Sequence, residues 1–468
     1  MEMTKQARGV SRPVLYIITA YMVFLTIYTL GVRIDIFTTA FDMIREKLGF
    51  IYWYGIQVAG CGLIGLILIF VSRKTLKRAD IGLLAGLMIW LAASAVMNRD
   101  LGGLKENLSG VVTIAVTVVA FYLVGRFFSG EDLHFCLTRV LLWGSVIWNY
   151  GCIVSLGMYF SNHRGYYHFG GFIRRSRQGL MDGRLFGCFS DPNYAALITL
   201  LLTGGLVFLL RYHRKSLGED AEKKPLWFQA ERIYIVISLI AYVLYFVLSG
   251  SRSGDTALVA TVIILIVFVT WRDEKRSVRT FAVRLFGALA IMAVVYFGTL
   301  FAVQGIGQMT APERDVETEL ERNDVSTENI TNSRLDIWLD YLTLVKDRPA
   351  FGLSTRGALV YARQLDPESY LSVKGYNPHS MFVQMIVQGG VIGFLLMAVF
   401  LFRALIRIWK RGRNKLPLPT LFLLALFWVL IHGVFCVFNV GIFITPCFEA
   451  MLAWIGLGYL EQSCEEEA

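Results

Sequence analysis

Residues 285–303 read LFGALAIMAVVYFGTLFAV, a run without a single charged side chain. A helix needs about 20 mainly apolar residues to cross the hydrocarbon core of a bilayer. Comparable runs recur near 14–32, 51–71, 80–97, 108–128, 136–160, 193–211, 232–249, 254–271, 284–304, 381–402, 420–438 and 442–460. The sequence therefore predicts an all-α polytopic membrane protein with about twelve transmembrane helices, forming a single integral membrane domain over residues 1–468.

The composition points the same way. Hydrophobic residues make up 56% of the chain and charged residues only 17%, against about 25% charged in a soluble domain. An outer-membrane barrel would show alternating segments of about 10 residues, which this sequence lacks. Membrane lipid is therefore the expected surrounding of most of the chain.

The formal net charge of +10 is spread over short connections between the apolar runs. Lys and Arg are enriched in short cytoplasmic loops, and the richer set of loops includes the one before the first run and the one after the tenth. We therefore expect a multi-pass protein of the cytoplasmic membrane with both termini in the cytoplasm. Because the basic residues are divided among short loops, nucleic acid is not an expected partner.

Residues 305–380 form the longest connection, between the ninth and tenth spans, and we expect it on the extracytoplasmic side. Within it, Ser333 and Asp336 resemble a capping box, which predicts an amphipathic helix at about 333–347. The apolar face of this helix should carry Leu335, Trp338, Leu339, Leu342 and Val345. Such a helix can lie on the bilayer or roof the spans.

Two arginines are expected to lie at the outer membrane surface. Arg252 lies in Leu248-Ser-Gly-Ser-Arg-Ser-Gly254, between the seventh and eighth spans, and Arg184 directly precedes the sixth span. The simpler reading of Arg252 is an arginine that snorkels to the interface. The small residues around it favour another reading, because they let an anion approach the backbone and the start of the next helix.

Arg334 lies on the predicted loop helix and is the third candidate, with a solvated helix face as the alternative. Three guanidinium groups around one site suit a phosphate group, because each can donate two parallel hydrogen bonds to its oxygens. The sequence has no glycine-rich phosphate loop and no HExxH motif, and its seven cysteines form no CxxC pair. We therefore expect no metal and no cofactor.

A histidine stands at the start of the tenth span, in Tyr376-Asn-Pro-His-Ser380. With an ordinary pKa of about 6.5, a histidine can accept a proton near neutral pH. A helix N-terminus disfavours the imidazolium and would help to keep His379 neutral. The alternative is a solvated ring at the first turn of a helix.

Four stretches carry a resemblance to a known family. They are Arg184–Asn193, Leu248–Gly254, Ser333–Trp338 with Asp347–Gly352, and His379–Gln384 with Gly389–Gly393. In this order, and with a large loop between the ninth and tenth spans, they resemble the O-antigen ligase and polymerase superfamily of bacterial membrane glycosyltransferases.

The resemblance implies glycosyl transfer at the outer face of the bacterial cytoplasmic membrane. The donor would be a polyprenyl-diphosphate-linked oligosaccharide, the acceptor a glycan or lipid-glycan, and the reaction metal-independent and inverting. Arg184 and Arg252 would bind the donor diphosphate, and His379, facing them, would be the general base. Ligases of the family often have His-Asn where this chain has His379-Ser380, so both polymerase and ligase stay open.

Two other functions fit parts of the sequence. A transporter, such as a lipid-linked glycan flippase or a polysaccharide exporter, also suits twelve spans with both ends inside. However, it should show an internal repeat and ionisable groups near the midplane, and we find neither pattern. The third alternative is a non-catalytic scaffold for polysaccharide assembly, against which the outward arginines and the histidine argue.

Overall fold

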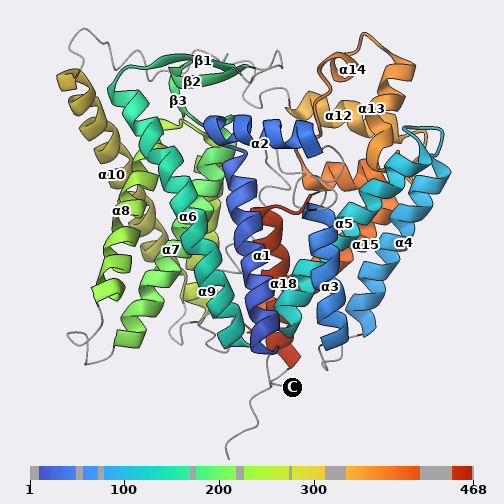
Figure 1. The fold of residues 1–468 in the computed structure, drawn as a ribbon, viewed down its shortest axis with the longest axis horizontal. Helices are drawn as coiled ribbons and strands as arrows, with labels where there is room; N and C mark the ends of the chain where they lie inside the picture. The colour runs from blue at the N-terminus through green and yellow to red at the C-terminus, as the bar shows by residue number, and fades with distance from the viewer. Residues whose placement is uncertain are drawn as a thin grey trace, which may run out of the picture. The chain divides into compact units, whose positions relative to one another are not determined.

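The computed structural model describes residues 10–48, 56–71, 78–168, 175–217, 226–272, 277–310, 334–411 and 445–465, most of them helical (Figure 1). The chain forms two compact units. The first unit comprises Met1–Val14, Trp53–Leu133 and Thr327–Ala468, and the second comprises Leu15–Tyr52 and His134–Ser326. The single membrane domain over residues 1–468 stays a prediction.

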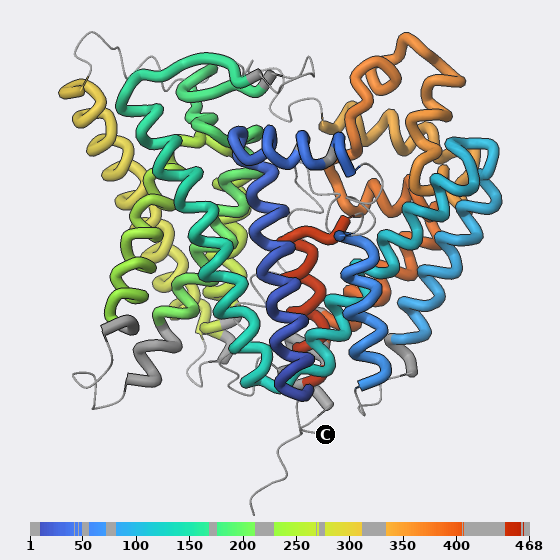
Figure 2. The backbone as a smooth tube through the Cα atoms, viewed as in Figure 1, coloured from blue at the N-terminus to red at the C-terminus, as the bar shows by residue number. Residues whose placement is uncertain are grey.

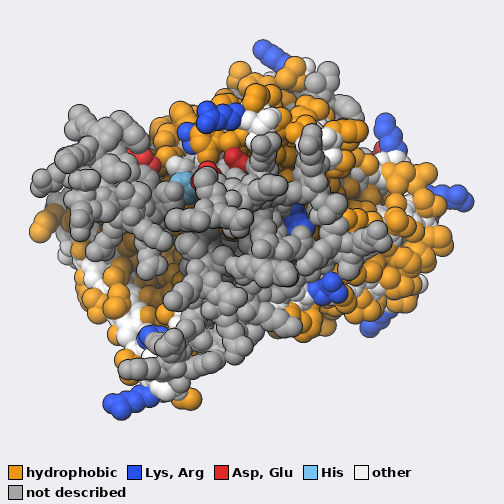
Figure 3. All heavy atoms as spheres, turned by 90° about the horizontal axis from the view of Figure 1, so that it is seen from below, with side chains coloured by type: hydrophobic (Ala, Val, Ile, Leu, Met, Phe, Trp, Pro, Cys, Tyr) orange, Lys and Arg blue, Asp and Glu red, His pale blue; other side chains and the backbone are white. Residues whose placement is uncertain are grey.

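Seven described helices are long and apolar enough to cross a membrane. They cover Arg12–Gly31, Leu104–Phe127, Gly130–Phe160, Pro192–Leu210, Gln229–Leu248, Val278–Thr310 and Met381–Ala404, and each coincides with a predicted span. Shorter apolar helices at Ile56–Val71 and Ile81–Met97 occupy two further predicted positions, whereas the predicted span 420–438 lies outside the described residues. Apolar side chains make up much of the described surface visible in Figure 3. A multi-pass helical membrane protein is confirmed, and the count of twelve stays a prediction.

The first unit contains eight named helices. They are α3 (Gly60–Val71), α4 (Arg78–Met97), α5 (Leu104–Phe127), α12 (Arg334–Val345), α13 (Ser354–Leu365), α14 (Tyr370–Lys374), α15 (Met381–Arg411) and α18 (Phe448–Glu465). Helices α5 and α18 pack with their backbones in close approach at Gly125 and Gly458. A Cβ at Gly125 would lie 2.1 Å from the Ile455 carbonyl oxygen, and one at Gly458 would lie 2.2 Å from that of Tyr122. Small residues allow such contacts between membrane helices, where van der Waals packing drives association.

Helix α15 is broken at Gly390, whose φ of 65° and ψ of −169° lie outside the helical region. The break is filled by the segment that precedes α13. The Leu353 N–H donates to the Val387 carbonyl at 2.7 Å, and the Val391 N–H donates to the Pro349 carbonyl at 2.8 Å. Backbone groups within a membrane must be satisfied internally, so this exchange makes the interruption of the helix tolerable.

Side chains of α4 satisfy the other carbonyls at the break. Trp90 Nε1 donates to the Gly389 carbonyl at 2.8 Å. Ser94 Oγ lies 2.8 Å from the Gln388 carbonyl and 2.6 Å from that of Phe351. Trp90 also stacks on the Phe351 ring, with centroids 4.5 Å apart. Helix α4 therefore fixes both the break and the segment inserted into it.

Helices α12, α13 and α14 lie together at one end of this unit (Figure 2). Helix α12 occupies the predicted position of the loop helix, although its predicted cap Ser333 lies outside the described residues. It buries Ile337, Tyr341 and Val345 and leaves Leu335 exposed. The contact of the predicted apolar face with the bilayer stays a prediction. Two apolar stripes lie side by side on this helix, and its packing partners select the one that carries Tyr341.

On the predicted apolar face, Leu339 and Leu342 are 62% and 36% exposed, whereas Val345 is buried. Gly357 lies within α13. Gly352 does adopt a turn conformation, with φ 65°.

The second unit contains most of α1 (Arg12–Gly31), together with α2 (Asp35–Leu48), α6 (Gly130–Phe160), α7 (Pro192–Leu217), α8 (Leu226–Leu248), α9 (Arg252–Arg272) and α10 (Val278–Thr310). Helix α2 runs crosswise at the end of α1 (Figure 1). Its first backbone N–H, from Asp35, donates to the Cys188 carbonyl at 2.9 Å, and the Ser190 N–H donates to the Arg33 carbonyl at 3.1 Å. The start of α2 is thus attached to the segment that leads into α7.

A small antiparallel sheet adds to the helical fold of the second unit. Its strands are β1 (Arg164–His168), β2 (Arg175–Met181) and β3 (Arg184–Gly187), in the order β1-β2-β3. Asp182 and Gly183, with φ of 52° and 67°, form the two-residue turn between Met181 and Arg184. An Asp-Gly pair in such a turn is a strong hairpin signal, which the sequence analysis did not use.

Replacing Gly390 by alanine should destabilise the first unit. Its backbone conformation is almost restricted to glycine and costs other residues about 1–3 kcal/mol, and an added Cβ would lie 2.2 Å from the Ala350 carbonyl oxygen. We expect Gly390→Ala to lower the midpoint of thermal unfolding of the protein in detergent. Gly393→Ala is the control, because the nearest atom to its Cβ is 3.5 Å away. Equal midpoints for the two variants would contradict this account of the break.

Candidate active site

Arg184 is the first residue of β3 and is only 5% exposed. Its Nε donates to the Ser249 carbonyl at 3.1 Å, and its Nη2 donates to Asn193 Oδ1 at 2.7 Å. Ser251 Oγ donates to the same Asn193 oxygen at 3.1 Å. Arg184 therefore holds the turn between α8 and α9, a role that the sequence did not reveal.

Arg252 opens α9 directly after this turn. Ser251 caps the helix, because its Oγ accepts a hydrogen bond from the Gly254 N–H at 3.1 Å, and Gly250 takes the left-handed conformation with φ 53°. The half-buried Arg252 is thus the first residue of a helix and lies at its N-terminus. Guanidinium and helix N-terminus together favour an anion.

The start of α7 adds a further arginine. Asp191 caps this helix, as the sequence suggests, with its Oδ1 accepting from the N–H groups of Asn193 at 2.7 Å and Tyr194 at 3.0 Å. Burial raises the pKa of Asp191, and the positive charges of Arg184 and Arg33 oppose that rise. Arg33 lies 4.1 Å from the centre of the Tyr194 ring. The place of Arg33 in this group was not predicted, because Arg33 follows an apolar run and belongs to no motif.

His379 belongs to the first unit and is held in a strained conformation. Its φ is 48°, a region that costs a residue with a side chain about 1–3 kcal/mol and is found mainly at functional sites. Its N–H donates to Asn377 Oδ1 at 3.0 Å. The next residue, Ser380, caps α15 with its Oγ, which accepts from the Val383 N–H at 3.4 Å, while its carbonyl accepts from the Gln384 N–H at 2.8 Å. His379 lies two residues before Met381, the first residue of α15, and its place before the tenth of twelve spans stays a prediction.

Helix α12 clamps the loop that carries His379. Trp338 Nε1 donates to the Pro378 carbonyl at 2.7 Å, and the Tyr341 hydroxyl donates to the Tyr376 carbonyl at 2.5 Å. These two side chains lie on one side of α12 and bracket the residues just before His379. The loop helix therefore positions the histidine, and the strained φ is maintained by contacts from outside the loop.

The environment of His379 keeps its ring neutral at pH 7. Burial, which leaves the residue 9% exposed, and then the positive charge of Arg334 lower the pKa of His379 to about 4. The sequence analysis expected the same direction from the helix N-terminus, but burial and Arg334 are the causes here. A neutral imidazole can accept a proton.

The four predicted site residues thus fall into two pairs. His379 and Arg334 lie close together in the first unit, and Arg184 is bonded to the turn before Arg252 in the second unit. The roles predicted for them, and the prediction that His379 faces the pair of Arg184 and Arg252, stay predictions.

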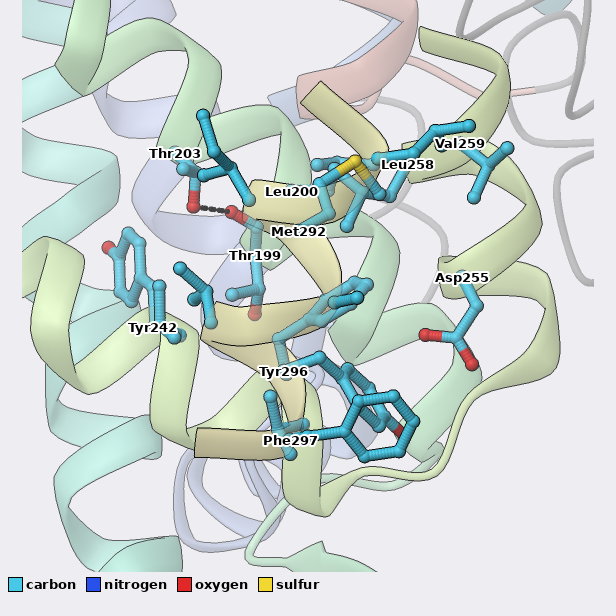
Figure 4. Close-up of a pocket in the computed structure, with 17 residues that line it drawn as sticks. Thr199, Leu200, Thr203, Tyr242, Asp255, Leu258, Val259, Met292, Tyr296 and Phe297 are labelled. Atoms are coloured by element: carbon cyan, nitrogen blue, oxygen red, sulfur yellow. Dashed lines mark hydrogen bonds between the residues drawn. The ribbon is translucent and has the colours of Figure 1, made fainter. Parts of the chain in front are cut away.

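A cavity of about 410 Å³ lies in the second unit among α7, α8, α9 and α10 (Figure 4). Its walls are mainly aliphatic and aromatic, with Leu258, Met292 and Phe297 among the lining side chains. Among the described residues that line it, Asp255 alone carries a charge. Asp255 lies three residues after Arg252 on α9, so the cavity begins one helical turn from that arginine.

Residues 235–398 match the family model described as O-antigen ligase. This matched range runs from α8 to α15 and includes Arg252, Arg334 and His379. No curated protein matches the chain. The match confirms the resemblance to the O-antigen ligase and polymerase superfamily and supports glycosyl transfer of the O-antigen ligase type.

Across the described residues, no group of three or more His, Cys, Asp or Glu side chains is placed to hold a metal ion.

Replacing Arg184 by alanine should lower stability. The change leaves the Ser249 carbonyl and the Asn193 amide oxygen without a buried charged donor, and hydrogen bonds to charged groups contribute about 1.5–3 kcal/mol. We expect a lower midpoint of thermal unfolding in detergent. Arg177→Ala is the matched control, because Arg177 is an exposed arginine of β2 that pairs with Asp182. If both variants unfold at the same temperature, Arg184 does not hold the turn.

Proposed function

We propose that this protein transfers an oligosaccharide from a polyprenyl-diphosphate-linked donor to a glycan or lipid-glycan acceptor at the outer face of the bacterial cytoplasmic membrane. The reaction is metal-independent and inverts the anomeric centre, as in a surface polysaccharide polymerase or ligase. The observation that carries the proposal is His379, a buried and neutral histidine on a strained loop within the matched range.

In this reaction an acceptor hydroxyl attacks the anomeric carbon of the donor sugar from the face opposite the diphosphate. The new bond joins that carbon to the acceptor oxygen, and the bond from the carbon to the phosphate oxygen breaks. His379 takes the hydroxyl proton as the bond forms, a contribution of general base catalysis that is commonly about 10²–10⁴-fold. Polyprenyl diphosphate leaves with the bonding electron pair.

The leaving diphosphate gains negative charge as the bond breaks. Fixed guanidinium groups that contact it stabilise the transition state more than the ground state. We assign this role to Arg252, whose place on the helix N-terminus is fixed by the turn that Arg184 holds. Arg334 gives the first unit a positive charge beside His379.

The polyprenyl tail of the donor needs an apolar site. The cavity among α7 to α10 supports the proposal, because its mainly apolar walls begin one turn from Arg252. Its volume of about 410 Å³ is within the range of about 300–1,000 Å³ for ligand pockets, enough for part of a prenyl chain. Diphosphate at Arg252 and prenyl chain in the cavity form a consistent donor site.

Replacing His379 by alanine should nearly abolish transfer. Without the base, formation of product from a lipid-linked oligosaccharide by the purified protein should fall about 10²–10⁴-fold, and in cells lipid-linked units should accumulate. His163→Ala is the control, because His163 is an exposed histidine beside β1 in the second unit. Product formation by His379→Ala at the rate of the control would refute the proposed role of His379.

The pH dependence provides a separate test. Because the neutral imidazole is the active form and kcat/KM for the donor reports the pKa of the donor-free protein, this constant should not change as the pH falls from neutral and should decline only near the pKa of about 4. Arg334→Gln removes the second cause of the low pKa and should move this decline to higher pH. Burial, the larger cause, remains, so the decline should stay below pH 6.5.

Lys346→Gln is the control for this experiment, because it also removes a positive charge at α12 but from an exposed position just beyond the helix. In this control, kcat/KM should decline at the same pH as in the unaltered protein. A decline of kcat/KM near pH 6.5 in the unaltered protein would contradict the environment described for His379.

A further inference from the structure

Two exposed tyrosines lead from the surface of the first unit to His379. The ring centroids of Tyr370 and Tyr376 are 5.9 Å apart, and those of Tyr376 and His379 are 6.0 Å apart. Tyr370 is 46% exposed and Tyr376 39% exposed, whereas His379 is 9% exposed. The three rings thus lie in a row, with the two tyrosines exposed to solvent and the proposed base buried at the other end.

Hydrogen bonds and helix caps fix the backbone at both tyrosines. The Tyr376 carbonyl accepts the hydrogen bond from the Tyr341 hydroxyl. Tyr370 opens α14, whose N-terminus is capped by Ser369 and whose C-terminus ends at Gly375 in the left-handed conformation. Caps at both ends fix the backbone of this short helix. The backbone that carries Tyr370 and Tyr376 is therefore held in place.

Exposed tyrosine rings combine a large apolar face with a polar hydroxyl, and this combination is enriched at binding surfaces. A pyranose ring has a complementary surface, because its axial C–H groups form an apolar face while its hydroxyls lie around the rim. Stacking of that face on an aromatic ring leaves the hydroxyls free to react. An acceptor sugar must present a hydroxyl to the base in this way.

We propose that Tyr370 and Tyr376 form a platform on which a pyranose ring of the acceptor glycan stacks, so that an acceptor hydroxyl reaches His379. The inference rests on the proposed function and names the acceptor side of the same site. The platform recognises the ring face, so it tolerates different hydroxyl patterns, and it binds the glycan part of the acceptor independently of any lipid anchor.

The test uses the full-length purified protein with a lipid-linked donor and a water-soluble oligosaccharide acceptor. Stacking interactions of aromatic rings contribute enough for Tyr376→Ala and Tyr370→Ala to raise the acceptor KM about 3- to 10-fold. The donor KM should stay unchanged and kcat should change little. Tyr376→Trp, which restores an aromatic face, should recover the acceptor KM.

Tyr166→Ala is the matched control, because Tyr166 is a 44% exposed tyrosine of β1 in the second unit. An unchanged acceptor KM in Tyr370→Ala and Tyr376→Ala, with the unaltered protein active, would overturn the platform and leave the proposed function standing. A loss confined to kcat would also overturn it, because it would show that the tyrosines only position His379. Impaired transfer to lipid-anchored acceptors alone would assign the contact to lipid and equally overturn it. If the unaltered protein forms no product, the proposed function itself fails.

Discussion

The hydrogen bonds around the break in α15 are the constraint on which the first unit depends. A membrane helix cannot leave carbonyl groups unsatisfied, and here Trp90 and Ser94 of α4 donate to those at the break. The same break accepts the segment before α13 through the Leu353 N–H. This insertion fixes α13 and with it the cluster of α12 to α14, which in turn clamps the loop before His379. The position of His379 thus follows from how a helix is interrupted about three turns further along.

The candidate site residues differ in how the protein uses their charge. Arg184 is buried and donates hydrogen bonds to a carbonyl and an amide oxygen. It therefore stabilises the turn before α9. Arg252 stands after that turn, half-buried, at a helix N-terminus. Two arginines that look alike in the sequence therefore have different environments. In the proposed mechanism Arg252 contacts the diphosphate, and Arg184 acts mainly by keeping Arg252 in place.

Apolar runs predicted the helices well, because length and hydropathy alone determine whether a segment can cross a bilayer. The sheet of β1, β2 and β3 was not predicted, although Asp182-Gly183 is a hairpin signal. The sequence places two apolar stripes on α12, and only the tertiary contacts of Tyr341 determine which of them packs inside the first unit. The place of His379 could be read from Asn377-Pro378. Its strained φ and burial could not, because Trp338 and Tyr341 lie about forty residues away in the chain.

The low pKa of His379 raises a chemical difficulty that the proposed substrate resolves. A base whose conjugate acid has a pKa of about 4 is neutral at pH 7 but weak, and general base catalysis works best when the pKa lies near the working pH. One cause of the low value is the charge of Arg334. A phosphate oxygen of the donor bound to Arg334 would offset that charge and raise the pKa of His379. The base would then be strongest when the donor is present. In its absence the low pKa of His379 keeps the ring neutral at pH 7.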